Sequence, residues 1–190
     1  MTKKLVARFA LVVTGLVASG LAVSVLGVSA PSPAPQQATT PAQPPQFLPI
    51  EAQWCLPTEP GQGLAPGPGT CIQLEVPRTP RQYAWGLMQR PALGALRGMW
   101  FRFEPEAPLS FWMHRTLVPL DLIFLRAGRV IAIEAAAPPC PRLPCPSYRS
   151  PGTADGVVEL DAGEAARLGI RPGSPAPIRW NDVPSAPARD

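Results

Sequence analysis

A tryptophan and a histidine stand two residues apart in the segment 109–114, Leu-Ser-Phe-Trp-Met-His. Alternate side chains of a strand point to opposite faces, so Trp112 and His114 should share the less apolar face. A tryptophan beside hydrogen-bonding groups can stack on a flat apolar face such as a sugar ring. We therefore predict a ligand-binding surface whose other members are carried in by loops; its five residues are Trp112, His114, Arg115, Asp121 and Tyr148.

A structural alternative exists for the same residues. A helix at 79–89 or the proline-rich loop at 138–151 could cover this face, which would make Trp112 a core residue and His114 a capped or surface one. Asp121 follows Pro119 and Leu120 at the entrance of a strand. It is expected to accept hydrogen bonds from the backbone or from an arginine, with Arg115 as a candidate partner, rather than to act as a base.

The sequence gives less support to other arrangements of reactive residues. A Ser-His-Asp set needs its serine hydrogen-bonded to its histidine, and along a strand Ser110 and His114 would be about 13 Å apart. Glu104 and Glu106 are expected to solvate a turn rather than to form a carboxylate pair for glycoside hydrolysis. A zinc site needs four ligands, and His114 is the single histidine of the chain. We predict no metal, no cofactor and no catalytic residue.

The four cysteines predict two disulfides. All four lie beyond the hydrophobic N-terminus, and an even number of cysteines in an exported chain favours cross-links. Three pairings are possible. We predict Cys55–Cys71 and Cys140–Cys145 because each pair brackets a loop rich in proline or glycine.

The N-terminus predicts export. Lys3, Lys4 and Arg8 precede an uncharged apolar run from 9 to 30, as in a signal peptide. The run is also long enough to cross a bilayer. Pro31 would directly follow the cleavage site, where a signal peptidase should accept it poorly. Residues 1–30 are therefore either a cleaved signal peptide or an uncleaved membrane anchor. Both place the rest of the chain in the periplasm or another extracytoplasmic space, secreted or held at the inner membrane.

Composition divides the remainder of the chain. Residues 31–46 contain only Pro, Ala, Ser, Thr and Gln, which predicts an extended linker. A β domain should occupy 47–182, and 183–190 should form a flexible tail. Without the first three basic residues the chain has 14 basic and 13 acidic residues, a net charge of +1. That balance excludes the electrostatic footprint of nucleic-acid binding.

Short segments with strand patterning alternate with Gly/Pro turns and predict a mainly β fold, a compact sandwich-like or barrel-like domain with one or two short helices. Thr79, Pro80 and Gln82 form the start signal of a helix that should run to Gln89. Asp161 is expected to cap a second short helix. The expected strands are 71–76, 99–103, 109–114, 121–126, 129–135, 157–161 and 176–180.

Several segments together resemble one bacterial and archaeal family, domain of unknown function 192 (DUF 192). They are the sequences at 86–90, 98–101, 111–113, 116 with 119–121, 139–140 with 145–148, and 158–160 with 163 and 168–170. The resemblance covers roughly 70–180 and implies a compact β-sandwich-like fold without a known activity. His114 and Arg115 stand where the family usually has Lys-Asn, and the segment between Cys55 and Cys71 resembles an insertion.

These observations favour a non-enzymatic binding or accessory domain of the cell envelope. Its ligand would be a small molecule, a glycan or an envelope protein, and an uncleaved N-terminal segment would tie it to the membrane. The alternatives are an envelope hydrolase that uses His114 and Asp121 as acid–base groups, and a purely structural domain.

Overall fold

The computed structural model describes residues 43–57 and 69–181. The predicted signal or anchor at 1–30, most of the predicted linker and the predicted tail lie outside these ranges. The elements along the chain are β1 (Ile50–Cys55), β2 (Cys71–Glu75), α1 (Pro80–Trp85), β3 (Arg97–Trp112), β4 (Leu120–Arg126), β5 (Arg129–Ala137), β6 (Ser147–Asp161), α2 (Glu164–Arg167) and β7 (Ile178–Trp180).

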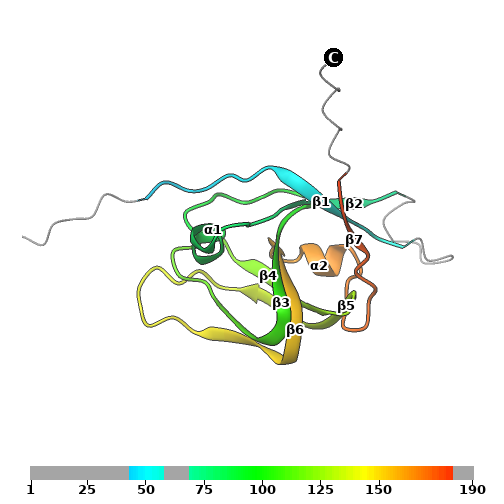
Figure 1. Cartoon of the computed structure of the whole chain (residues 1–190). Coiled ribbons are helices and arrows are strands. Elements are labelled where there is room, and N and C mark those ends of the chain that lie inside the picture. The colour runs from blue at the N-terminus through cyan, green and yellow to red at the C-terminus, as the bar shows by residue number, and fades with distance from the viewer. Residues whose placement is uncertain (1–42, 58–68, 182–190) are drawn as a thin grey trace, which may run out of the picture. The chain divides into compact units, whose positions relative to one another are not determined.

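The strands form one seven-stranded sheet in the order β5-β4-β6-β3-β2-β1-β7 (Figure 1). The β2–β3 pair is parallel and the other pairs are antiparallel. Parallel neighbours need a crossover connection, and α1 lies in this one. The mainly β prediction is confirmed, but the sheet is not closed into a barrel, because β5 and β7 end the strand order without pairing as strands.

Two predicted strands, 99–103 and 109–114, are one long strand, β3. Its antiparallel partner β6 pairs with it from Gly98 opposite Leu160 to Trp112 opposite Ser147. A shift of register between Arg102 and Ala107 absorbs the Glu-Pro-Glu sequence that suggested a break. The strand ends at Trp112, so His114 lies just beyond it, in an isolated bridge with Cys140.

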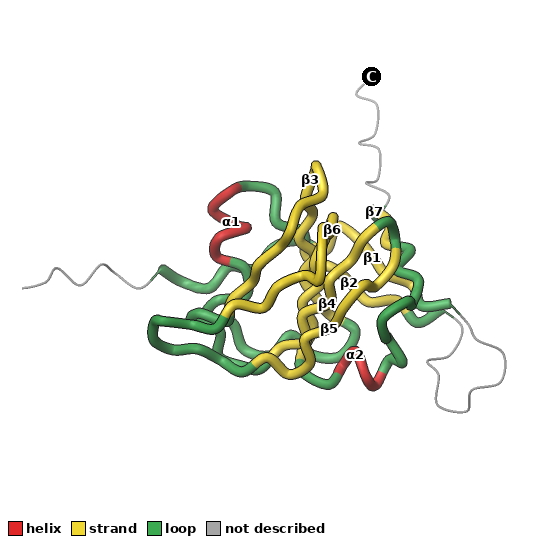
Figure 2. Tube along the Cα trace, turned by 90° about the horizontal axis from the view of Figure 1, so that it is seen from below, coloured by secondary structure: helices red, strands yellow, loops and turns green. Residues whose placement is uncertain are grey.

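Side chains alternate between the two faces of the sheet and build two hydrophobic clusters. The α2-side cluster is Ala52, Trp54, Ile72, Leu74, Val76, Ile123, Leu125, Val130, Val158, Leu160, Ala165, Leu168, Ile170 and Ala176. The α1-side cluster is Leu87, Met99, Phe101, Leu109, Met113, Leu120, Leu122, Phe124, Ala137, Cys140, Ala154 and Val157. Figure 2 shows the two helices on opposite sides of the strands.

The helix α1 begins where the sequence predicts and ends earlier. The Thr79 hydroxyl accepts from the Gln82 amide, and the Gln82 side chain accepts from the Thr79 amide, which completes a capping box. Gly86 has φ +50° and ends the helix after Trp85, not at Gln89. A β-carbon on Gly86 would lie 3.3 Å from the Phe101 ring, so this turn packs closely on β3.

The Asp161 prediction is wrong. Gly163 is the N-cap of α2 and provides no side-chain hydrogen bond. The Asp161 carboxylate instead accepts from the backbone amides of Leu93 and Gly94 in the segment before β3. A carboxylate two residues before a glycine N-cap was free to bind another set of amides, and tertiary contact selected these.

Both disulfides have the predicted pairing. Cys55–Cys71 joins β1 to β2 across paired positions of the sheet, and Cys140–Cys145 closes a short loop before β6. Within residues 43–57 and 69–181, no helix has the length and apolarity needed to cross a bilayer.

Candidate functional site

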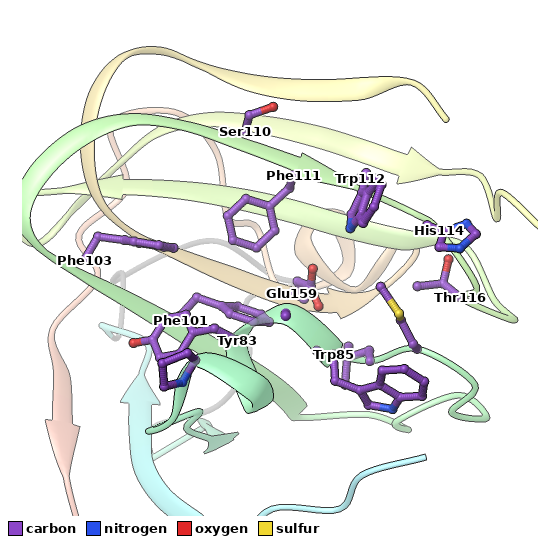
Figure 3. Close-up of a pocket in the computed structure, with 15 residues that line it drawn as sticks. Tyr83, Trp85, Phe101, Phe103, Ser110, Phe111, Trp112, His114, Thr116 and Glu159 are labelled. Carbon is purple, nitrogen blue, oxygen red and sulfur yellow. The ribbon is translucent and has the colours of Figure 1, made fainter. Parts of the chain in front are cut away.

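A cavity of about 470 Å³ opens between α1 and the strand β3 (Figure 3). Its size lies within the usual range of small-molecule sites. The residues that line it come from α1 and its C-terminal turn, from both halves of β3, from the loop after β3 and from β6. They are Pro80, Tyr83, Ala84, Trp85, Gly86, Leu87, Met88, Phe101, Phe103, Ser110, Phe111, Trp112, His114, Thr116 and Glu159.

Aromatic rings form the inner wall of this cavity. Phe101 packs edge-to-face on Phe111 with ring centroids 5.1 Å apart, and Phe103 packs likewise on Phe111 at 6.2 Å. Tyr83 of α1 meets Phe101 edge-to-face at 5.9 Å. The Tyr83 hydroxyl donates to the carbonyl oxygen of Arg102 at 2.7 Å, which fixes the ring against β3. Edge-to-face packing is favourable between aromatic rings, so the wall is held in place without a ligand.

Glu159 places a carboxyl group at the base of the aromatic wall. It pairs with Met99 of β3 and Leu122 of β4, so it lies in the middle of the sheet. Figure 3 shows its carboxyl group between Phe101 and Phe111 on one side and Trp112 and His114 on the other. Glu159 is 5% exposed. In the described part of the chain no hydrogen bond or ion pair reaches this carboxyl group.

Burial decides the charge state of Glu159. Removal from water disfavours the ionised form of a carboxyl group, and burial raises the pKa of Glu159 from 4.5 to about 8. The group is therefore mainly protonated at neutral pH. A perturbed carboxyl group that faces a cavity without a partner is a mark of a functional site.

Trp112 and His114 lie at the mouth of the cavity. Trp112 is 47% exposed, so neither α1 nor the 138–151 loop covers it as the structural alternative required. Its ring is 5.3 Å from that of His114, at a tilt of 44°. The His114 Nδ1 atom lies 3.7 Å from the Cys145 sulfur, so the short disulfide loop borders the histidine. Trp112 and His114 thus share one cavity wall.

Asp121 lies on the other face of the sheet. It sits opposite Leu160, a member of the α2-side cluster, whereas Glu159 sits opposite Leu122 of the α1-side cluster. Asp121 is 1% exposed, and its carboxylate accepts from the backbone amides of Ala136 and Ala165. It therefore has the structural role expected of it, although its donors are backbone amides and not Arg115.

Arg115 and Tyr148 are close in space to the site without lining it. Arg115 has φ +58°, and its backbone amide donates to the Cys140 carbonyl while its own carbonyl accepts from Gln89. These bonds tie the loop after β3 to the segment that follows α1 and to the disulfide loop. Tyr148 pairs with Phe111 across β3 and β6 and packs against the α1-side cluster.

Glu159 and the aromatic wall are not among the residues predicted from the sequence. The signal for Glu159 was a carboxylate inside the apolar run Val-Val-Glu-Leu, which in a central strand must be buried. The signal for the wall was the alternation of Phe101 and Phe103 with polar neighbours. Neither pattern says that α1 stops short and leaves space above these residues.

Glu75, a second buried carboxylate near the site, has partners. Glu75 pairs with Arg90 at 2.6 Å and accepts from the Leu48 amide, and the Arg90 guanidinium lies 4.4 Å from the Phe47 ring centroid. The Gln46 side chain, within the predicted linker, donates to the carbonyls of Gln82 and Gly86 and joins the start of the described chain to α1.

In residues 43–57 and 69–181, His, Cys, Asp and Glu side chains form no group of three or more able to hold a metal ion.

A match to a known family identifies the family of this chain. Residues 64–178 match the family DUF192, described as Uncharacterized ACR. The chain belongs to the DUF192 family. No curated protein matches the sequence.

Two solved structures are similar to this member of the DUF192 family. A protein of unknown function from Novosphingobium aromaticivorans shares 31% identity, covers 73% of this chain and 94% of its own, and gives a TM-score of 0.56. A Sinorhizobium meliloti protein proposed to be a transcription regulator shares 28% identity, covers 68% of this chain and 92% of its own, and gives a TM-score of 0.57. The resemblance seen in the sequence motifs is confirmed, and it brings no activity with it.

Proposed function

We propose that this protein is a non-enzymatic binding domain of the cell envelope and that the cavity between α1 and β3 holds a small ligand. The observation that carries the proposal is the unpaired Glu159 carboxyl group at the base of an aromatic cavity. Ligand sites are mainly apolar, with a few placed polar groups that orient the ligand. Trp112 at the mouth offers a flat surface for stacking, and His114 offers a hydrogen-bonding group, as a sugar ring would require.

The envelope location rests on two independent features. The basic and apolar segment at the N-terminus has the order of an export signal or anchor. Two disulfides persist in oxidising compartments and are rare in the cytosol. Together they favour a domain that works outside the cytoplasm, free or tethered.

The two acid–base residues of the hydrolase alternative do not share the cavity. His114 lines the cavity, but Asp121 faces the α2-side cluster and its oxygens already accept two backbone amides. General acid–base catalysis needs both groups within reach of the reacting atoms. Binding without turnover therefore accounts better for this arrangement.

A ligand screen with matched tryptophan variants tests the binding role. Full-length protein is screened by ligand-detected NMR against monosaccharides, disaccharides and small aromatic compounds, and hits are repeated with Trp112→Ala and Trp180→Ala. Trp180 is 40% exposed and does not line the cavity. We expect Trp112→Ala to weaken binding at least tenfold and Trp180→Ala to leave it unchanged. Equal effects of both variants, or the absence of any hit, would contradict the proposal.

The location has its own test. Cells expressing the full-length chain are fractionated, and the protein is alkylated without reduction and analysed by mass spectrometry. We expect it in the envelope or outside the cell, with all four cysteines protected. A cytosolic protein with four alkylated thiols would exclude the envelope role.

A further inference from the structure

We infer that the ligand group that reaches Glu159 is a protonated amine, carried by a small molecule with an apolar or ring-shaped body. This inference rests on the proposed binding role of the cavity and names the chemistry of its ligand.

The described residues include four buried carboxylates, and three of them have partners. Glu75 pairs with Arg90, Glu164 pairs with Arg167 at 2.6 Å, and Asp121 accepts two backbone amides. Glu159 has none of these. A buried carboxylate is costly unless a cation or hydrogen-bond donors compensate it. In the free protein Glu159 avoids this cost by keeping a proton. No described residue could compensate its ionised form, so we assign that role to a positive group of the ligand.

The walls of the cavity suit a cation. Among the described residues no lysine or arginine lines it, so no permanently charged side chain there repels a positive charge or competes for the carboxylate. The rings of Tyr83, Phe101, Phe111 and Trp112 surround the space in front of Glu159 (Figure 3). Aromatic faces attract ammonium groups, most strongly when water is excluded. The same rings would pack against the apolar body of the ligand.

A neutral ligand would instead use the Glu159 carboxyl group in its uncharged, protonated form. The protonated form can donate one hydrogen bond to a carbonyl or hydroxyl oxygen. That contact leaves the rings without a charge to stabilise. The dependence of affinity on pH separates the two cases, because a cation requires the carboxylate and a neutral acceptor requires the acid.

The expected pH dependence follows from the pKa of about 8 that burial gives Glu159. A cation must displace the proton, so its apparent affinity should rise about 100-fold from pH 6 to pH 9. Met99 and Leu122, opposite Glu159 on β3 and β4, carry no charge. The other titratable side chains at the cavity are Tyr83 of α1 and His114. The series is therefore repeated with His114→Gln, which removes the histidine that can take up a proton.

The experiment compares three probes on the full-length protein by isothermal titration calorimetry. Benzyltrimethylammonium is permanently cationic, benzylamine is cationic up to its own pKa, and benzyl alcohol is a neutral molecule of the size of benzylamine. We expect both cations to bind more tightly than the alcohol at pH 8 to 9. Glu159→Gln should weaken them at least tenfold, whereas Glu134→Gln, the same change at an exposed position of β5, should have no effect.

The possible results separate this inference from the binding role itself. If benzyl alcohol binds as well as the amines, or if affinity for the cations stays flat or falls between pH 6 and pH 9, the inference is wrong and the binding role stands. If no probe binds, the inference is also wrong, and the saccharide and aromatic screen decides the binding role alone. Thermal unfolding verifies that Glu159→Gln is folded, and the wild-type pH series tests the inference without any variant.

Discussion

The two faces of the sheet differ in whether every buried carboxyl group has a partner. On the α2 side, Asp121 and Glu164 reach backbone amides or an arginine, and the cluster around them is built mainly of aliphatic side chains. On the α1 side, Glu75 lies opposite Met99 and pairs with Arg90. Phe101 and Phe111 surround the other buried carboxyl group of that side, Glu159, to which the described residues offer no partner. The helices differ likewise: α2 buries Glu164 and Ala165, whereas α1 buries none of its six residues.

This difference distinguishes a face that stabilises the fold from one that is available to a ligand. Satisfied buried polar groups add rigidity, and closely packed aliphatic residues leave no room for a guest. A helix that ends early over aromatic residues leaves a cavity, and an unpaired carboxyl group inside it destabilises the free protein. Proteins tolerate such costs mainly at functional sites.

We expect the largest difference in the free energy of unfolding between substitutions of one tryptophan on each face of the sheet. Trp54 is fully buried in the α2-side cluster, and its Nε1 donates to the Pro175 carbonyl at 3.3 Å. Trp54→Ala should lower the free energy of unfolding by about 4 kcal/mol because it leaves a large void. Trp112→Ala removes a ring that is 47% exposed and should cost less than about 1 kcal/mol. Urea unfolding of both variants measures the two values, and similar losses would remove the distinction between the faces.

A slightly smaller effect should appear in the pH dependence of stability. Burial raises the pKa of Glu159 from 4.5 to about 8, so the folded protein keeps a proton that the unfolded chain has already released. The contribution of this group is therefore largest below pH 4.5 and is lost as pH rises toward 8. Relative to Glu159→Gln, the wild-type protein should lose roughly 3 kcal/mol between pH 5.5 and pH 8.

Urea unfolding of both proteins across that range tests the sign. Glu159→Gln should show the smaller pH dependence and be the more stable protein at pH 8. Parallel curves would mean that water or another group compensates Glu159, and the contrast between the faces would lose its main support.

The smallest of these effects concerns Asp121. Asp121→Asn keeps the size of the side chain but leaves one of the amides of Ala136 and Ala165 facing an NH₂ group. An unsatisfied buried donor costs about 2 kcal/mol, and guanidinium unfolding at pH 5.5 should show a loss of this size. Glu159→Gln, the matched change on the other face, should be neutral within about 0.5 kcal/mol at that pH, because no partner is lost. Equal losses from both variants would show that Glu159 has a partner after all.

Local signals in the sequence predicted much of the fold. The capping box at Thr79, the strand expected at 71–76 and the pair of strands expected at 121–126 and 129–135 depend on residues close in the chain, and the structure has each of them. The prediction failed where distant segments compete. Asp161 could cap α2 or bind the Leu93 and Gly94 amides, and only the packing of that segment against β6 decided.

The sequence alone determined which residues have stacking, hydrogen-bonding and cross-linking chemistry, and that Trp112 and His114 stand close together. It also determined the pairing preference of the cysteines and the family, because these follow from local spacing and from motifs. Only the tertiary structure decided that Asp121 and Glu159, on adjacent strands, face opposite sides. A one-residue change of register reverses the face of a side chain, and register is set by pairing between strands far apart in the chain. The same pairing, with the early end of α1, placed an unpaired carboxyl group in an aromatic cavity.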